Sequence, residues 1–72
     1  MTREEALQAV ATELDRATAK YGPFHSAHEG YGVIMEEVNE FEDAIRGKDF
    51  ENLRQEAIQC AAMFTRFLID TN

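Results

Sequence analysis

Apolar residues recur at helical spacing in three separate segments, and this pattern limits the chain to an all-α fold. In the first segment the apolar positions lie three or four residues apart: Leu7, Val10, Leu14, Ala17 and Tyr21. Thr2 precedes Glu5 by three residues, which is the pattern of a capping box at the start of a helix. Gly22 and Pro23 interrupt the chain after this stripe. Together these signals predict a helix over residues 3–20.

The second segment carries the same period in Tyr31, Ile34, Val38, Phe41 and Ile45. Ser26 and Glu29 form a second capping-box pattern, and Gly47 follows the last apolar residue as a C-terminal cap. A helix over residues 27–46 is therefore expected. Gly30 and Gly32 fall in its first turns, where each costs up to about 1 kcal/mol relative to alanine. They either weaken the start of the helix or mark a close approach to the backbone.

A third helix is expected over residues 50–70, with Asp49 as its N-cap. Its apolar residues define two faces rather than one. One face contains Leu53, Ala57, Phe64 and Leu68, and the other contains Ile58, Ala62 and Ile69. A helix that is apolar on two sides usually has two partners. In a chain with three helices, the second partner is expected to be another subunit.

The 72-residue length allows a single domain, residues 1–72, with a small core. Cys60 is the only cysteine, so no disulfide can form within the chain and oligomerisation is the expected source of further buried area. The predicted fold is an antiparallel three-helix chain that assembles into an oligomeric helical bundle. The sequence shows neither a membrane span nor a signal peptide, so a cytoplasmic location is expected. The net charge of -7 argues against nucleic acid as a direct partner.

Negative charge is concentrated on the second helix. Glu29, Glu36, Glu40 and Asp43 fall on one face of that helix at 100° per residue. Like charges at these spacings repel by a few tenths of a kcal/mol, roughly, for each pair. This row is either a solvated surface or part of a site.

Two glutamates lie at the edges of apolar faces instead. Glu37 falls on the flank of the apolar face of the second helix, and Glu56 has the same placement on the third. If these helices pack antiparallel, Glu37, Glu40 and Glu56 converge. Three carboxylates suit a hard divalent cation such as magnesium or manganese. Alternatively, Arg54 or Arg66 pairs with these acids in a purely structural role.

The acidic motif resembles that of a known family. Glu36-Glu37-x-x-Glu40 followed by Glu56 is similar to the signature of the all-alpha, MazG-like nucleoside-triphosphate pyrophosphohydrolases, and residues 24–31 and 56–63 look like a small branch of that group. The resemblance implies a helical bundle, active as a dimer or tetramer, that splits a nucleoside triphosphate into a monophosphate and pyrophosphate. It also implies magnesium ligands at Glu37, Glu40 and Glu56, with Glu36 as a further ligand or as the base that orients water.

One position departs from the family pattern. The last acid of the motif, an aspartate in the family, is Gln59 in this chain. An amide oxygen can still bind a metal, so Gln59 is predicted as a neutral ligand, but it cannot act as a base. This substitution leaves catalysis and non-catalytic nucleotide binding open as alternatives, besides a structural bundle whose acids only keep it soluble.

Four residues around the first loop are candidates for contact with a nucleotide: Lys20, Tyr21, His25 and His28. A cation beside aromatic residues can hold a phosphate and stack a base. The simpler alternative is that this loop, with Phe24, packs on the core and that the histidines are loop and capping residues.

Overall fold

The computed structural model describes residues 1–71, which form three α-helices and no strand. Helix α1 spans Arg3–Lys20, α2 spans Ala27–Arg46 and α3 spans Phe50–Asp70. These bounds confirm the helices predicted from the apolar stripes.

Side chains at the helix starts explain why the helices begin where they do. Thr2 accepts a hydrogen bond from the Glu5 backbone N–H, and the Glu5 carboxylate accepts one from the Thr2 N–H, so the predicted capping box is present. At α2 only half of the predicted box forms. Ser26 accepts from the Glu29 N–H, but the Glu29 carboxylate bonds His25 instead of the Ser26 backbone.

The turn between α2 and α3 is a Schellman motif, which fixes the hairpin. The N–H of Asp49 donates to the Ala44 carbonyl at 2.9 Å, and the N–H of Lys48 donates to the Ile45 carbonyl at 3.2 Å. Gly47 is the C-cap in ordinary right-handed conformation, whereas Lys48 takes the left-handed position with a φ of 55°. Asp49 then caps α3 by accepting from the Asn52 N–H, as predicted.

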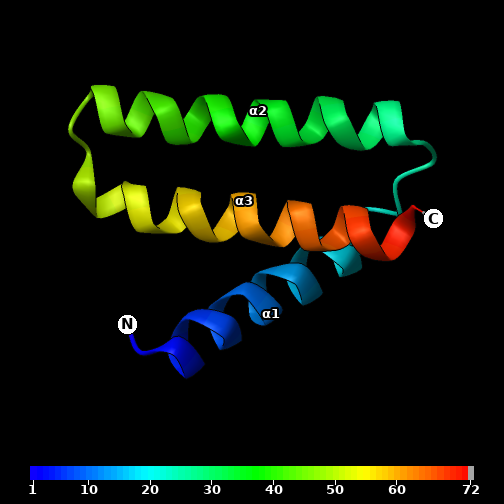
Figure 1. The fold of residues 1–72 in the computed structure, drawn as a ribbon, viewed down its shortest axis with the longest axis horizontal. Helices are drawn as coiled ribbons and strands as arrows, with labels where there is room; N and C mark the ends of the chain where they lie inside the picture. Colours follow the sequence, from blue (N-terminus) through cyan, green and yellow to red (C-terminus); the bar gives the residue numbers. More distant parts are fainter. Residues whose placement is uncertain (72) are drawn as a thin grey trace.

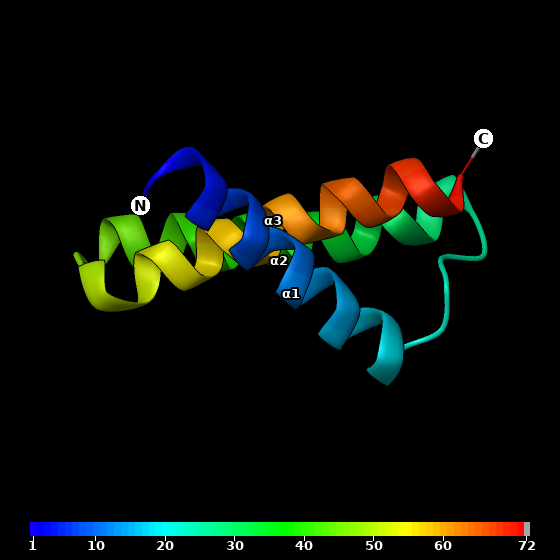
Figure 2. The same cartoon turned by 90° about the horizontal axis from the view of Figure 1, so that it is seen from below.

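The three helices do not form a closed bundle. Helices α2 and α3 lie antiparallel and side by side, while α1 crosses α3 obliquely (Figures 1 and 2). Helix α1 packs against α3 and makes no backbone approach to α2. Since α2 and α1 contact different sides of α3, the space between them stays open.

The core lies where α1, the loop before α2, and α2 itself pack against α3. It consists of Ala17, Phe24, Ile34, Ala62 and Met63, with partly buried aliphatic residues and Phe67 around it. Within the described residues, no large side chain is fully buried. Leu7 and Tyr21 belong to the predicted stripe of α1, but both are exposed. The N-terminal end of α1 leaves the α2–α3 pair in Figure 1, and its C-terminal end leaves the pair in Figure 2.

One predicted apolar face of α3 is uncovered. Phe64 is 54% exposed and Leu68 is 78% exposed, and Ala57 on the same face is also exposed. On the other predicted face Ala62 is fully buried and Ile58 is half-buried, whereas Ile69 near the end of α3 is 63% exposed. No helix in the described part of the chain is long and apolar enough to cross a membrane.

Gly30 marks a close approach of α2 to its neighbours. A Cβ atom at this position would lie 2.8 Å from the Phe67 ring and 3.0 Å from the Phe24 ring. Both distances are shorter than van der Waals contact, and the rings belong to the packed interior. At Gly32 an added Cβ would meet nothing within 4 Å. The two glycines therefore have different roles, although they occupy the same helix two residues apart.

We predict opposite effects of alanine at these two positions. Gly32→Ala should raise the free energy of unfolding by about 0.5–1 kcal/mol, because it adds only helix propensity. Gly30→Ala should lower it by about 1–3 kcal/mol, because the methyl group overpacks the contact with Phe67. Urea denaturation followed by circular dichroism measures both changes. Equal stabilisation by the two substitutions would show that the close approach at Gly30 is wrong.

Candidate functional site

Three carboxylates from two helices converge in the structure, as the sequence predicts. Each of Glu37, Glu40 and Glu56 offers one oxygen, and these oxygens all lie within 4.8 Å of one another. The spacing of three residues places Glu37 and Glu40 on one side of α2. The antiparallel packing of α3 then brings Glu56 to the same place.

The three carboxylates differ in their surroundings. Glu56 is buried, and its Oε1 accepts a hydrogen bond from Asn52 Nδ2 at 3.1 Å. Glu37 is half-buried and Glu40 is exposed. None of the ion pairs among residues 1–71 includes any of the three acids. The cluster thus concentrates negative charge without a protein cation bonded to it.

This concentration of charge changes the protonation of two members. Desolvation raises the pKa of Glu37, and the charges of Glu40, Glu56, Glu13 and Glu36 raise it further. Desolvation also raises the pKa of Glu40, followed by the charge of Glu56 and the contact with its carboxyl group. Both effects favour a neutral carboxyl group in the protein without a cation. A bound divalent cation would act in the opposite direction.

Gln59 connects two members of the cluster. With its amide oriented to satisfy its neighbours, the side-chain nitrogen donates to Glu56 Oε2 and to Glu37 Oε2, each at 3.2 Å. A neutral donor therefore holds together two carboxylates that repel each other. In this orientation the amide oxygen is turned away from both, so its predicted role as a metal ligand requires rotation of the amide.

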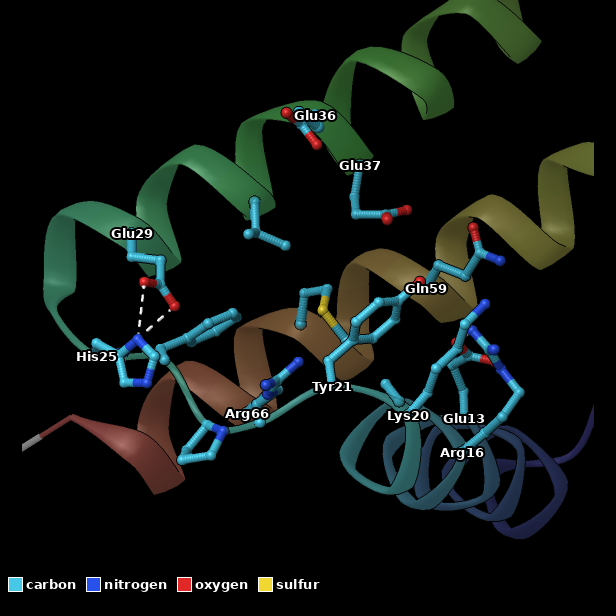
Figure 3. Close-up of a pocket in the computed structure, with 16 residues that line it drawn as sticks. Glu13, Arg16, Lys20, Tyr21, His25, Glu29, Glu36, Glu37, Gln59 and Arg66 are labelled. Carbon is cyan, nitrogen blue, oxygen red and sulfur yellow. Dashed lines mark hydrogen bonds and ion pairs between the residues drawn. The ribbon is translucent and has the colours of Figure 1, made fainter.

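A cleft of about 660 Å³ borders the cluster. Its walls differ in charge (Figure 3). Helix α2 contributes Glu29, Glu36 and Glu37, whereas α1 contributes the cations Arg16 and Lys20 and one acid, Glu13. The two walls face each other across α3 because α1 crosses that helix obliquely. The charge of Glu37 also contributes to the raised pKa of Arg16, after the larger effect of Glu13. Such a cleft offers cation-binding and anion-binding groups in one space.

The basic wall is organised by an ion pair within α1. Arg16 Nη2 contacts Glu13 Oε2 at 2.6 Å, and Arg16 Nε donates to Glu13 Oε1 at 2.9 Å. Glu13 is buried, while the Arg16 side chain is about half exposed. The bidentate contact fixes the direction of the guanidinium group. Hydrogen bonding from Arg16 lowers the pKa of Glu13.

Three of the four predicted nucleotide contacts line this cleft. Lys20, Tyr21 and His25 do so, and Lys20 Nζ lies 5.3 Å from the centre of the Tyr21 ring. His25 also bonds Glu29, with 3.2 Å between Nδ1 and Oε2. His28 is exposed and does not border the cleft. Phe24 belongs to the core, so only Tyr21 offers an exposed aromatic face from this loop.

Neither arginine considered as a structural partner of the acids pairs with them. Arg66 bonds Asp70, and Arg54 forms no ion pair among residues 1–71. Sequence reasoning missed Glu13, Arg16 and Arg66 as residues of the cleft. The three-residue spacing of Glu13 and Arg16 is a signal for the ion pair between them. That they face Glu37 follows from the crossing of α1 over α3, which has no signal in the sequence.

Compared with protein-family models, with curated proteins and with solved structures, the chain matches none of them at a significant level. The resemblance to MazG-like enzymes thus rests on the motif residues, and a function has to be argued from the site.

The raised pKa values predict how stability depends on pH. The folded chain binds protons at Glu37 and Glu40 more tightly than the unfolded chain, so the free energy of unfolding should fall as pH rises above 4.5, the ordinary glutamate value. The lowered pKa of Glu13 acts in the other direction and removes stability below 4.5. Thermal unfolding across pH, without divalent cations, measures both branches. Glu37→Gln should flatten only the branch above 4.5, and an unchanged profile would contradict the charge cluster.

Proposed function

We propose that the chain is a magnesium-dependent nucleoside triphosphate pyrophosphohydrolase that works as a homo-oligomer. One observation carries this proposal: Glu37, Glu40 and Glu56 bring their oxygens within 4.8 Å at the edge of a cleft whose opposite wall is basic. An acidic cluster alone is common on protein surfaces. Its position beside a cleft with Arg16 and Lys20 favours a ligand that needs both a cation and basic side chains.

The donor set fits magnesium or manganese. All three residues supply carboxylate oxygens, which hard cations prefer, and no cysteine or histidine belongs to the cluster within the described residues. The desolvated carboxyl of Glu37 and the mutual repulsion of the three acids would both be relieved by a divalent charge. Manganese would occupy the same oxygens.

The remaining groups have parts in hydrolysis at the α-phosphorus. Bound magnesium would neutralise phosphate oxygens and lower the pKa of a water molecule. Glu36 is exposed on α2 and lines the cleft. It would accept a proton from the attacking water as the water oxygen bonds to the α-phosphorus and the bond to pyrophosphate breaks. Lys20 would contact phosphate, and the exposed ring of Tyr21 would stack on the base. The volume of the cleft is within the range typical of small-molecule sites.

A second function, nucleotide binding without cleavage, is favoured by Gln59. Its amide nitrogen occupies the position between Glu37 and Glu56 where the family pattern has a carboxylate. The site therefore has one negative charge fewer for metal ions and one candidate base fewer. A binder and an enzyme would share the metal dependence and differ in pyrophosphate release.

A second copy of the chain is proposed to cover the open face of the α2–α3 pair. Helix α1 and the cleft occupy one side of this pair. Tyr31 and Ile45 on α2, with Phe64 and Leu68 on α3, point by helical periodicity to the other side, and all four are exposed. Since no large side chain among the described residues is fully buried, the isolated chain gains unusually little from its own core. Docking two such faces would bury these apolar residues.

For the metal site we predict that Glu40→Gln weakens binding of Mn²⁺ by more than about tenfold, because even residues that only orient metal ligands typically contribute that much. Helicity should be retained, because Glu40 is exposed. Calorimetric titration with Mn²⁺ and with Mg²⁺ measures the change. Glu42→Gln is the matched control, since it lies on the same helix and pairs with Arg46 outside the cluster.

Release of pyrophosphate then separates the two functions. The wild-type chain should release it from deoxynucleoside triphosphates in the presence of Mg²⁺, and Glu40→Gln should abolish this release. Metal-dependent nucleotide binding without release would favour the second function. If the wild-type chain binds neither metal, or if Glu42→Gln weakens binding as much as Glu40→Gln, the proposed site is wrong.

For the assembly we predict that Phe64→Gln combined with Leu68→Gln shifts the protein to a monomer, because both substitutions make the exposed face polar. Sedimentation velocity measures the mass in solution. Ile69→Gln is the control, because the exposure of Ile69 lies between those of Phe64 and Leu68 but its side chain points to another side of α3. A wild-type chain that sediments as a monomer would refute the proposed interface.

A further inference from the structure

A buried arginine forms part of the cleft. Arg66 is only 5% exposed, yet it borders the same cleft as the acidic wall of α2. Its guanidinium group points from α3 toward Tyr21 and the interior of the cleft (Figure 3). A buried charge needs a partner, because removing it from water is costly. The partners of Arg66 therefore indicate its role.

The guanidinium is held by contacts on one edge and one face. Its Nε donates to Asp70 Oδ2 at 3.3 Å, and the same oxygen accepts a hydrogen bond from the Phe24 N–H at 2.9 Å. The guanidinium carbon lies 4.4 Å from the centre of the Phe24 ring. Asp70 thus ties the loop before α2 to the end of α3, and the guanidinium plane is fixed between them. Asp70 is a positioning residue for Arg66.

The two Nη groups are not used by these contacts. Among residues 1–71, every hydrogen bond of Arg66 goes through Nε to Asp70. Arg66 lines the cleft although only 5% of its surface is exposed, so the small exposed part of its side chain borders open space. A fixed guanidinium whose Nη groups make no hydrogen bond within residues 1–71 presents a planar fork of donors, the arrangement that binds phosphate or carboxylate oxygens in bidentate fashion.

The surroundings of Arg66 favour the cleft as the place where an anion binds. Arg66 also borders a smaller cavity of about 400 Å³ beside α1, but that cavity is lined by Asp15 and Asp70. The larger cleft adds Arg16 and Lys20 near Tyr21. Its acids are Glu13, which is paired with Arg16, and three glutamates of α2. On its α1 side an anion would meet two cations besides Arg66, whereas the smaller cavity offers Arg66 alone beside two aspartates.

We propose that Arg66 binds a phosphate group of the ligand through its two Nη groups. The end of the cleft beside Tyr21 is then an anion subsite, separate from the cation subsite at Glu37, Glu40 and Glu56. This assignment deepens the proposed function and takes its phosphate ligand from it. It would also allow a chain with a net charge of -7 to bind phosphate, because the anion would lie against a fixed cation.

Inorganic pyrophosphate is the probe for this subsite. Calorimetric titrations are made on the full chain, once with EDTA and once with Mg²⁺. Arg66→Gln should weaken binding by about tenfold or more in either condition where the wild-type chain binds, as expected for loss of hydrogen bonds to a charged group. Arg66→Lys should also weaken it, because lysine lacks the bidentate fork. Arg54→Gln is the matched control: it removes the same charge from an exposed position of α3 and should leave binding unchanged.

A measurement on the wild-type chain guards against variants that do not fold. Arg66 is the one buried arginine among the described residues, so its Nε–H resonance can be distinguished by NMR. Addition of pyrophosphate should shift this resonance and leave that of Arg54 in place. An Arg66 resonance that stays unchanged at saturating pyrophosphate would overturn the proposal, as would a wild-type chain that binds no pyrophosphate in either condition.

Binding of Mn²⁺ alone separates this inference from the proposed function. Arg66→Gln should leave Mn²⁺ affinity within about twofold of the wild type, because Arg66 forms no ion pair with the three acids. Metal binding together with an Arg66→Gln variant that binds pyrophosphate normally would refute only the anion subsite. Pyrophosphate binding that depends on Arg66, in a chain that binds no metal, would uphold the subsite and refute the metal-dependent function.

Discussion

The contact between α2 and α3 determines where the three carboxylates of the candidate site lie. At Gly30 the backbone of α2 approaches Phe67 so tightly that a Cβ atom has no room. The Schellman turn at Lys48 fixes the other end of the same pair. Between these two points the helices are held in one register, and that register places Glu56 opposite Glu37 and Glu40. A shift of one turn, about 5.4 Å, would separate the carboxylates beyond the reach of a single cation.

The oblique crossing of α1 adds the second half of the site. A helix packed into the groove between α2 and α3 would have closed a conventional bundle and buried more apolar area. Instead the backbone of α1 approaches that of α3 and not that of α2, and this leaves a cleft with an acidic and a basic wall. The arrangement reduces the core, which contains no fully buried large side chain among the described residues. The open cleft therefore leaves less apolar surface buried within the chain. Contact with a second subunit would bury more of it.

The sequence was sufficient for the helices and for the carboxylate cluster, because both follow from helical periodicity. Apolar stripes and capping residues determine the helix bounds, and antiparallel packing of neighbouring helices brings Glu37 close to Glu56. The basic side of the cleft could not be predicted in this way. Arg16 and Arg66 face it because of the crossing of α1 and the link between Phe24 and Asp70, which are tertiary features without a local signal. The Glu29 carboxylate accepts a hydrogen bond from the His25 N–H rather than from the Ser26 N–H. This competition between neighbouring donors also has no signal in the sequence.

Gln59 shows how the site balances stability against charge. An aspartate there would place a fourth carboxylate beside Glu37 and Glu56, in a region where desolvation and repulsion already raise the pKa of Glu37. The amide instead donates to both neighbours and stabilises them when no cation is bound. The same hydrogen bonds would compete with a metal for the oxygens of Glu37 and Glu56, so four carboxylates would bind a cation more tightly than this set. With so small a core, hydrogen bonds that hold Glu37 and Glu56 together without a cation contribute to the stability of the folded state.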